Sequence, residues 1–168
     1  MKLNVNEYNS YYESYIEKSN QKPIVEGLSD NLERIVLFFR AIPKGKQDYS
    51  YAEGKWTIKD ILLHIIDTER IFSYRALRIS RNDKTPLPGF EHNDYVFNAS
   101  ASNRSLESLL EEYTAVRKAT IALYNSLNPP VLLEIGEASG FPISVRAIGY
   151  IITGHENHHC EIIKQRYL

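Results

Sequence analysis

Residues 57–80, TIKDILLHIIDTERIFSYRALRIS, decide the fold, because their apolar residues recur at helical spacing from Ile58 to Ile79. Thr57 offers a hydroxyl cap at the start, and Asp60 follows three positions later, which is close to a capping box. The segment therefore predicts an amphipathic helix of about 20 residues, whose apolar face must pack against other helices.

Three further segments show the same periodicity. They cover residues 23–42, 105–127 and 144–168, and prolines or glycines follow the first two. A tyrosine-rich segment at residues 9–19 predicts a short additional helix before them. We find no convincing alternating pattern of the kind that predicts a strand.

Four amphipathic helices of similar length predict an all-α protein, a four-helix bundle. Residues 84–103 form a long connection between the second and third of these helices, with prolines at 86 and 88. A connection of that length in a small domain is typically a crossover, a functional loop or both. No repeat or composition shift divides the chain, so residues 1–168 are expected to form a single domain.

Composition excludes several classes of function. Twenty Lys and Arg against 21 Asp and Glu give a net charge of −1, which offers no reason to expect nucleic-acid binding. No apolar run approaches the roughly 20 residues of a membrane span, and the first residues lack the apolar centre of a signal peptide. The single cysteine, Cys160, cannot form an internal disulfide. We expect a cytoplasmic protein that does not bind membranes.

Three of the five histidines lie on predicted inward faces of helices. His155 and His159 fall one turn apart on the apolar face of the last helix, and His64 shares a stripe with Ile61 and Ile71. A single histidine in such a place is usually a core residue held by hydrogen bonds. Three together predict a metal site, since neutral imidazoles are common ligands of divalent ions.

The remaining histidines and one motif are less specific. His158 lies at the edge of the apolar face, and His92 lies in the long connection. Each is expected to face a substrate, to support a metal ligand from outside the coordination sphere, or to be exposed. Residues 155–159, HENHH, match the H-E-x-x-H motif of zinc proteases. Only nine residues follow, and no strand is predicted to bind a peptide, which argues against a protease. Glu156 stays open as a general base.

The chain resembles the DinB-like superfamily, including its YfiT branch, over most of its length from about residue 48. The matching segments are residues 51–60, 67–79, 144–152 and 154–159, together with His64. The resemblance implies a bundle with up-down-down-up connections and a divalent ion, zinc or nickel, on His64, His155 and His159. Some relatives transfer thiols such as bacillithiol or mycothiol, others are only assumed to be hydrolases, and members often form homodimers.

Two further charged residues are candidates near the site. Arg75 follows His64 by eleven residues on nearly the same stripe, where it could bind a substrate carboxylate or phosphate or pair with a neighbouring acid. Asp67 could orient an imidazole or be an exposed charge. The candidate catalytic residues are thus Arg75, Glu156 and His158, and no residues are predicted to bind an organic cofactor.

Three functions fit this sequence. The first is a metal-dependent transferase that activates a low-molecular-weight thiol for attack on an electrophilic small molecule. The second is a metal-dependent hydrolase that uses activated water at the same site. The third is a non-catalytic, metal-binding stress-response protein whose ion stabilises the fold.

Overall fold

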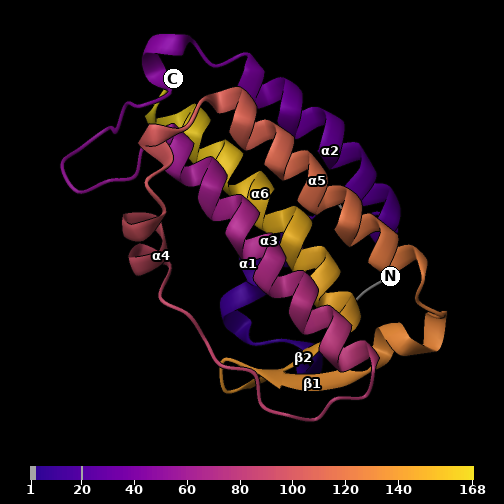
Figure 1. Cartoon of the computed structure of the whole chain (residues 1–168). Helices are drawn as coiled ribbons and strands as arrows, with labels where there is room; N and C mark the ends of the chain where they lie inside the picture. Colours follow the sequence, from indigo (N-terminus) through magenta and orange to yellow (C-terminus); the bar gives the residue numbers. More distant parts are fainter. Residues whose placement is uncertain (1–2, 20) are drawn as a thin grey trace.

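Four long helices lie side by side in the computed structural model, which describes residues 3–19 and 21–168 (Figure 1). They form a four-helix bundle, so the prediction of an all-α fold is confirmed. Helices α3 and α2 each pack against both α5 and α6. The bundle helices are α2 (Ile24–Arg40), α3 (Ile58–Ser80), α5 (Leu106–Asn125) and α6 (Val145–Arg166).

Side-chain caps explain where three of these helices begin. At α3, the Thr57 hydroxyl accepts from the Asp60 amide at 3.1 Å, and the Asp60 carboxylate accepts from the Thr57 amide at 2.9 Å. Ser105 and Ser144 cap α5 and α6 through single hydrogen bonds. Each cap satisfies an amide that has no partner inside the helix, which fixes the first turn.

Contacts between helix ends show how the chain runs through the bundle. Lys59 Nζ donates to the carbonyls of Ser102 and Arg104, so α3 and α5 begin at the same end. The Tyr124 hydroxyl donates to the Val145 carbonyl at 2.9 Å, so α5 ends where α6 begins. The connection between α3 and α5 must therefore travel the length of the bundle, as Figure 1 shows.

This connection contains a helix that the sequence pattern does not predict. It contains the short helix α4 (His92–Ala99), whose residues are all at least partly exposed. Before α4, the Leu87 amide donates to the Glu137 carbonyl, and the Leu87 carbonyl accepts from the Ser139 amide. The crossover is thereby tied to residues near the start of α6.

Those residues form a β-hairpin, which corrects the expectation that the chain has no strand. Strands β1 (Ile135–Ala138) and β2 (Phe141–Ser144) pair antiparallel. Ser139 and Gly140 join them with φ of 56° and 81°, as a tight two-residue hairpin turn requires. Four residues per strand are too few to display a clear alternation, so periodicity could not reveal them.

The N-terminal segment packs against α6 through a close backbone approach. Its helix α1 (Glu13–Glu17) is shorter than the predicted residues 9–19 and follows a single 3-10 turn at Ser10–Tyr12. A Cβ atom on Gly154 would lie 1.6 Å from the Tyr15 carbonyl oxygen, so only glycine fits there. This approach places a group of tyrosines over the middle of the bundle.

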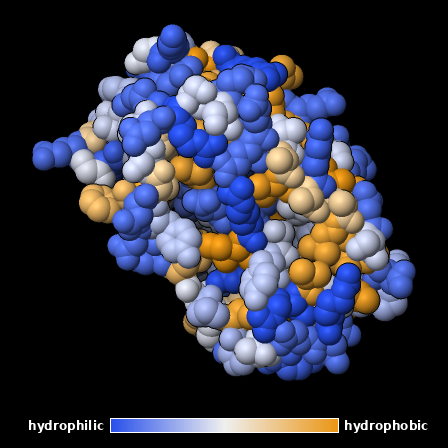
Figure 2. Space-filling model, in the orientation of Figure 1, coloured by the Kyte–Doolittle hydropathy of each residue, from blue (hydrophilic) through white to orange (hydrophobic). Residues whose placement is uncertain are grey.

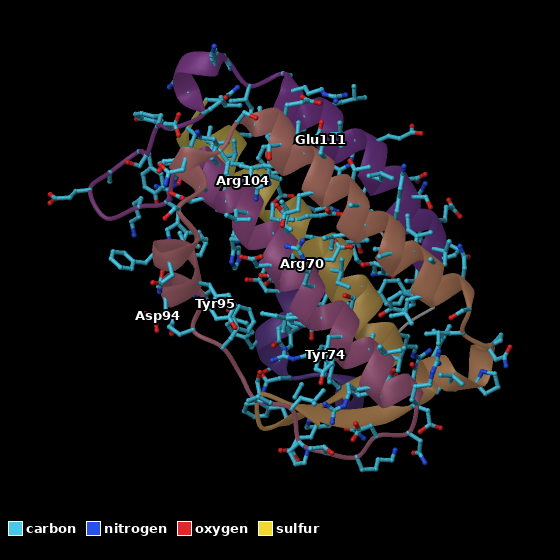
Figure 3. All side chains as sticks on the ribbon, viewed as in Figure 1. Arg70, Tyr74, Asp94, Tyr95, Arg104 and Glu111 are labelled. Atoms are coloured by element: carbon cyan, nitrogen blue, oxygen red, sulfur yellow. The ribbon has the colours of Figure 1, made fainter. Side chains whose placement is uncertain are left out.

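The outer surface is mostly hydrophilic in the view of Figure 2, with hydrophobic patches between the polar side chains. Arg70 on α3 and Arg104, just before α5, both donate to Glu112. Figure 3 labels the two arginines among the side chains on this outer face of the bundle. Among the described residues, no helix is long and apolar enough to cross a membrane.

Candidate metal centre

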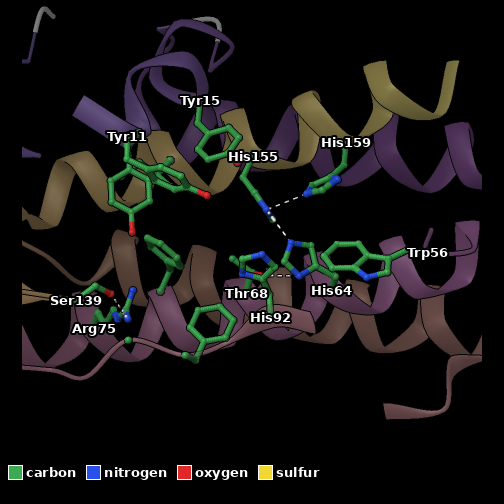
Figure 4. Close-up of a pocket in the computed structure, with 15 residues that line it drawn as sticks. Tyr11, Tyr15, Trp56, His64, Thr68, Arg75, His92, Ser139, His155 and His159 are labelled. Carbon is green, nitrogen blue, oxygen red and sulfur yellow. Dashed lines mark hydrogen bonds between the residues drawn. The ribbon is translucent and has the colours of Figure 1, made fainter. Parts of the chain in front are cut away.

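Three imidazoles from two helices converge inside the bundle. His64 projects from α3, and His155 and His159 project from consecutive turns of α6. The Nε2 atom of His155 lies 3.0 Å from that of His64 and 3.0 Å from that of His159 (Figure 4). One nitrogen from each ring falls within 4.8 Å of the others. The structure thus brings together the three residues that the sequence selected.

Burial keeps these rings neutral. Desolvation lowers the pKa of His64 to about 4, and it lowers the pKa of His155 and His159 well below the usual range, helped by the neighbouring imidazoles. Each Nε2 atom of a neutral ring carries either one proton or one lone pair, so His155 Nε2 can make a good hydrogen bond with only one of its two neighbours. Hydrogen bonds among the three rings therefore cannot satisfy all three nitrogens.

A divalent ion fits this set of donors. A tetrahedral ion with bonds of about 2.0–2.1 Å holds neighbouring ligand nitrogens roughly 3.3 Å apart. The separations of 3.0 Å from His155 to His64 and to His159 are close to that value, and all three nitrogens lie within 4.8 Å of one another. Within the described residues, no other His, Cys, Asp or Glu joins the group, so it offers three protein ligands. Three ligands and an open position are typical of catalytic rather than structural zinc sites.

A threonine, and not the predicted aspartate, lies beside the His64 ring. Thr68 Oγ1 lies 3.5 Å from His64 Nδ1, one helical turn further along α3. Asp67 instead faces Arg70 on the outside of the bundle, and partial burial raises its pKa. Of the two interpretations of Asp67 from the sequence, the structure favours a surface charge. Thr68 is placed to orient the His64 imidazole.

The open side of the cluster faces a cavity of about 320 Å³. Its walls are mainly aromatic, and no acidic residue lines it in the described part of the chain. The N-terminal segment, α3 and the crossover all contribute to the walls. The aromatic residues are Tyr11, Tyr12, Tyr15, Trp56, Phe72 and Phe90.

The other two histidines have different positions. His92, at the start of α4, lines the cavity, and its ring centroid lies 5.9 Å from those of Trp56 and His64. The sequence signal for a functional role of His92 is its place on the long connection between α3 and α5. His158 is absent from this cavity and is half-buried, with its ring against Tyr15 and His159. The catalytic candidate His158 therefore does not line the cavity that the cluster faces, and lines a separate one with Trp56 and His159.

Arg75 lines the cavity at a distance from the histidines. Its Nη2 atom donates to the Pro88 carbonyl at 2.8 Å and to Ser139 Oγ at 3.0 Å. Among the described residues it has no acidic partner, so the predicted alternative of an ion pair is wrong. Sequence reasoning missed Ser139, because only the unrecognised hairpin turn carries it to this place.

Glu156 lies on the opposite side of α6 from the cavity. Its fully buried carboxylate accepts from Arg117 at 2.7 Å, from Tyr113 at 2.8 Å and from Asn31 at 2.6 Å. Arg117 also binds Glu69, which completes a cluster within the core. This argues against the role of general base that the sequence left open for Glu156, because its oxygens accept hydrogen bonds in the core and it does not line the cavity.

Comparison with known proteins agrees with this architecture. A sequence model of the DinB superfamily matches residues 28–163, which include all three clustered histidines. The chain belongs to the DinB superfamily. The family that the sequence segments resembled is therefore confirmed.

A solved structure gives the same fold. YfiT from Bacillus subtilis, described as a probable metal-dependent hydrolase with an unusual four-helix bundle topology, superposes with a TM-score of 0.72. The match covers 98% of this DinB superfamily chain and 90% of YfiT, at 14% sequence identity. At that identity the likeness shows the fold alone. A search of curated proteins found no match.

Proposed function

We propose that this DinB superfamily protein is a metal-dependent enzyme that binds zinc or nickel through His64, His155 and His159. In the leading form of the proposal, it transfers a low-molecular-weight thiol to an electrophilic small molecule. The observation that carries it is the group of three neutral imidazoles whose open side faces an aromatic cavity. When bound, the ion supplies Lewis acidity, which lowers the pKa of a thiol or water in its open position.

The chain's own residues would supply binding and orientation. Trp56 packs against His64 with ring centroids 4.8 Å apart, and Tyr15 packs against His155 at 5.3 Å. These rings limit the access of bulk water to the imidazoles and present apolar surface to a substrate. Thr68 Oγ1 lies 3.5 Å from His64 Nδ1, on the side of the ring away from the other two imidazoles, where it would help to orient the ring.

A hydrolase is the second candidate, favoured by the description of YfiT as a probable metal-dependent hydrolase. In a hydrolase the same three histidines would hold the ion, and water would take the place of the thiol at its open position. A non-catalytic, stress-response role fits less well, because structural zinc sites are usually closed by four protein ligands. The cavity suits a small molecule as substrate, whereas the net charge of −1 argues against nucleic acid. The homodimer and the cytoplasmic location stay predictions.

Metal binding is the first test. We expect His64→Ala and His159→Ala to lower metal affinity more than about a hundredfold, since loss of mere supporting residues already costs 10–100-fold. The matched control is His158→Ala, which removes an adjacent imidazole outside the cavity and should leave metal content unchanged. Metal content that is unchanged in both ligand variants would contradict the proposal.

Turnover separates the candidates. An electrophile is incubated with the metal-loaded protein with and without added thiol. Product that requires the thiol supports the transferase, and product formed without it supports the hydrolase. Melting on addition of a chelator, with no product under either condition, would support the non-catalytic role.

A further inference from the structure

The cavity has two chemically different ends. The imidazole cluster occupies one, and the Arg75 guanidinium occupies the other (Figure 4). Arg75 follows His64 by eleven residues on α3, which corresponds to about 16 Å along the helix axis between their Cα atoms. Phe72 and Thr68 line the wall on the turns between them. A ligand that touches both ends must therefore be elongated, with an apolar middle.

Arg75 is buried without a compensating negative charge. Its residue is only 2% exposed, and no carboxylate pairs with it in the described part of the chain. The guanidinium lies over the Phe72 ring, with Cζ 5.0 Å from the centroid. Burying an unpaired charge costs several kcal/mol, so buried arginines normally have carboxylate partners. Burial also lowers the Arg75 pKa.

Two hydroxyls surround the guanidinium. Ser139 Oγ accepts from Arg75 Nη2 at 3.0 Å, and the Tyr12 hydroxyl lies beside both groups, where it interacts electrostatically with the guanidinium. A hydroxyl that accepts a hydrogen bond keeps its own proton to donate. Arginine, serine and tyrosine from three separate segments thus present donors to one corner of the cavity.

The segment that brings Ser139 here is held in an uncommon conformation. Ser139 has a φ of 56°, a left-handed value that is unfavourable for a residue with a Cβ atom. Its amide is fixed by the Leu87 carbonyl at 2.9 Å, and the Arg75 side chain holds the Pro88 carbonyl beside it. The hairpin turn, the crossover and α3 thus meet at this corner.

The permanent charge on the cavity wall is positive. Arg75 carries it, the other ionisable lining residues are four histidines and three tyrosines, and none of the described lining residues is acidic. A divalent ion on the imidazoles would add two further positive charges. The cavity therefore has a strong electrostatic preference for a negatively charged ligand.

We infer that the cavity binds an elongated substrate whose anionic end, a carboxylate or a phosphate, is held by Arg75, Ser139 and Tyr12. Its other end lies at the histidine cluster, where the reaction takes place. The inference deepens the proposed function and rests on it for the histidine end. It names the class of substrate, an anion with an apolar spacer between its charge and its reacting group.

The test uses linear ω-mercaptocarboxylates of increasing chain length, with the matching ω-mercaptoamides and ω-mercaptophosphonates. Cobalt-loaded protein reports the thiol through its absorption spectrum, and the single tryptophan, Trp56, reports binding in the cavity by fluorescence. We expect the anionic thiols to bind roughly tenfold to hundredfold tighter than the amides once the chain spans the cavity. Comparison of carboxylates with phosphonates identifies the preferred anion.

Two variants separate recognition from a structural role of Arg75. Arg75→Met should abolish the preference for the anion while binding of the neutral thiols to cobalt is retained. Ser139→Ala leaves the guanidinium in place and should reduce the preference severalfold, which keeps the test available if Arg75→Met does not fold. Equal affinity for anionic and neutral thiols in the unaltered protein, or an undiminished preference in both variants, would overturn the inference.

Failure of the proposed function has a different signature. If no thiol changes the cobalt spectrum, the metal site does not activate thiols, whatever Arg75 does. A metal-free arm then tests the Arg75 corner alone, with linear carboxylates against the corresponding amides and Trp56 fluorescence as the readout. Tighter binding of the carboxylates that is lost in Arg75→Met supports the anion corner, and equal binding overturns it.

Discussion

His155 and Glu156 are neighbours on α6, yet they enter two very different polar clusters. About 100° of helical rotation separates them, so one side chain faces the cavity and the other faces the core between α2 and α5. At Glu156, two carboxylates share the Arg117 guanidinium, and hydrogen bonds within the chain engage their oxygens and its nitrogens. At His155, three neutral rings turn nitrogens toward one another with no charged partner.

Two of the buried arginines, Arg75 and Arg117, repeat the contrast. Arg117 donates through all three of its side-chain nitrogens, to Glu69, Glu156 and the Leu28 carbonyl. Arg75 is almost as buried but binds only neutral groups. A polar cluster whose donors and acceptors are matched within the chain has no capacity left for a ligand, whereas an unmatched one does. The matched cluster serves the fold, and the unmatched groups line the cavity.

The largest expected effect comes from breaking the matched cluster. Arg117→Met leaves two carboxylates buried without their cation, and we expect the free energy of unfolding to fall by about 3–5 kcal/mol. Urea denaturation measures it. The control is Arg40→Met, which removes an exposed pair with Glu107 and should cost less than about 1 kcal/mol. Equal losses in the two variants would contradict the distinction between matched and surface charges.

The unmatched cluster should respond to metal instead. An ion at a hundredfold excess over its Kd adds about 2.7 kcal/mol to stability, which corresponds to a rise in Tm of roughly 5–10 °C. We expect zinc or nickel to produce this rise in the unaltered protein and a chelator to reverse it. In His155→Ala the ion should have little effect on Tm. A rise of the same size in that variant would place the ion elsewhere.

A third cluster, near the N terminus, gives a smaller and pH-dependent effect. Burial raises the pKa of Glu7, but hydrogen bonds from Arg146, the Asn4 amide and Ser144 outweigh it and lower the pKa to about 2. The ionised carboxylate therefore stabilises the fold above its unfolded pKa of 4.5, and this contribution is lost as the pH falls toward 2.

Glu7→Gln tests that assignment. We expect the variant to be less stable than the unaltered protein by about 1–2 kcal/mol at pH 7, because it keeps the shape of the side chain and loses its charge. The difference in the free energy of unfolding should shrink steadily as the pH falls from 4.5 to 2. Denaturation curves recorded at a series of pH values measure it. A difference that is constant over this range would show that the charge of Glu7 is not what stabilises the segment.

Local sequence patterns were sufficient to predict the four-helix bundle and to select the three histidines that cluster in it. The capping residues Thr57 and Ser144 and the apolar periodicity predicted where α3 and α6 begin, since both signals lie within a few residues of each other. The helical wheel then selected His64, His155 and His159, because their faces follow from periodicity alone.

What the sequence could not reveal depends on contacts between distant segments. Glu156 looked like part of a protease motif, and only the approach of Arg117 from α5 shows that it is a core residue. Ser139 lies in a hairpin whose strands are too short for periodicity to detect, and its role follows from contact with α3. Tyr12 reaches the cavity because Gly154 lets the N-terminal segment approach α6 closely.

The long crossover has a consequence for how such a protein can change its substrate. The bundle supplies all three imidazoles, whereas Phe90 and His92 come from the crossover, Ser139 from the hairpin and Tyr12 from the N-terminal segment. Substitutions in these outlying segments reshape the ligand's surroundings without disturbing the helix register that sets the ion's ligands. Under the proposed function, the bundle would carry the chemistry and the outlying segments the selectivity, so that each could vary while the other is kept.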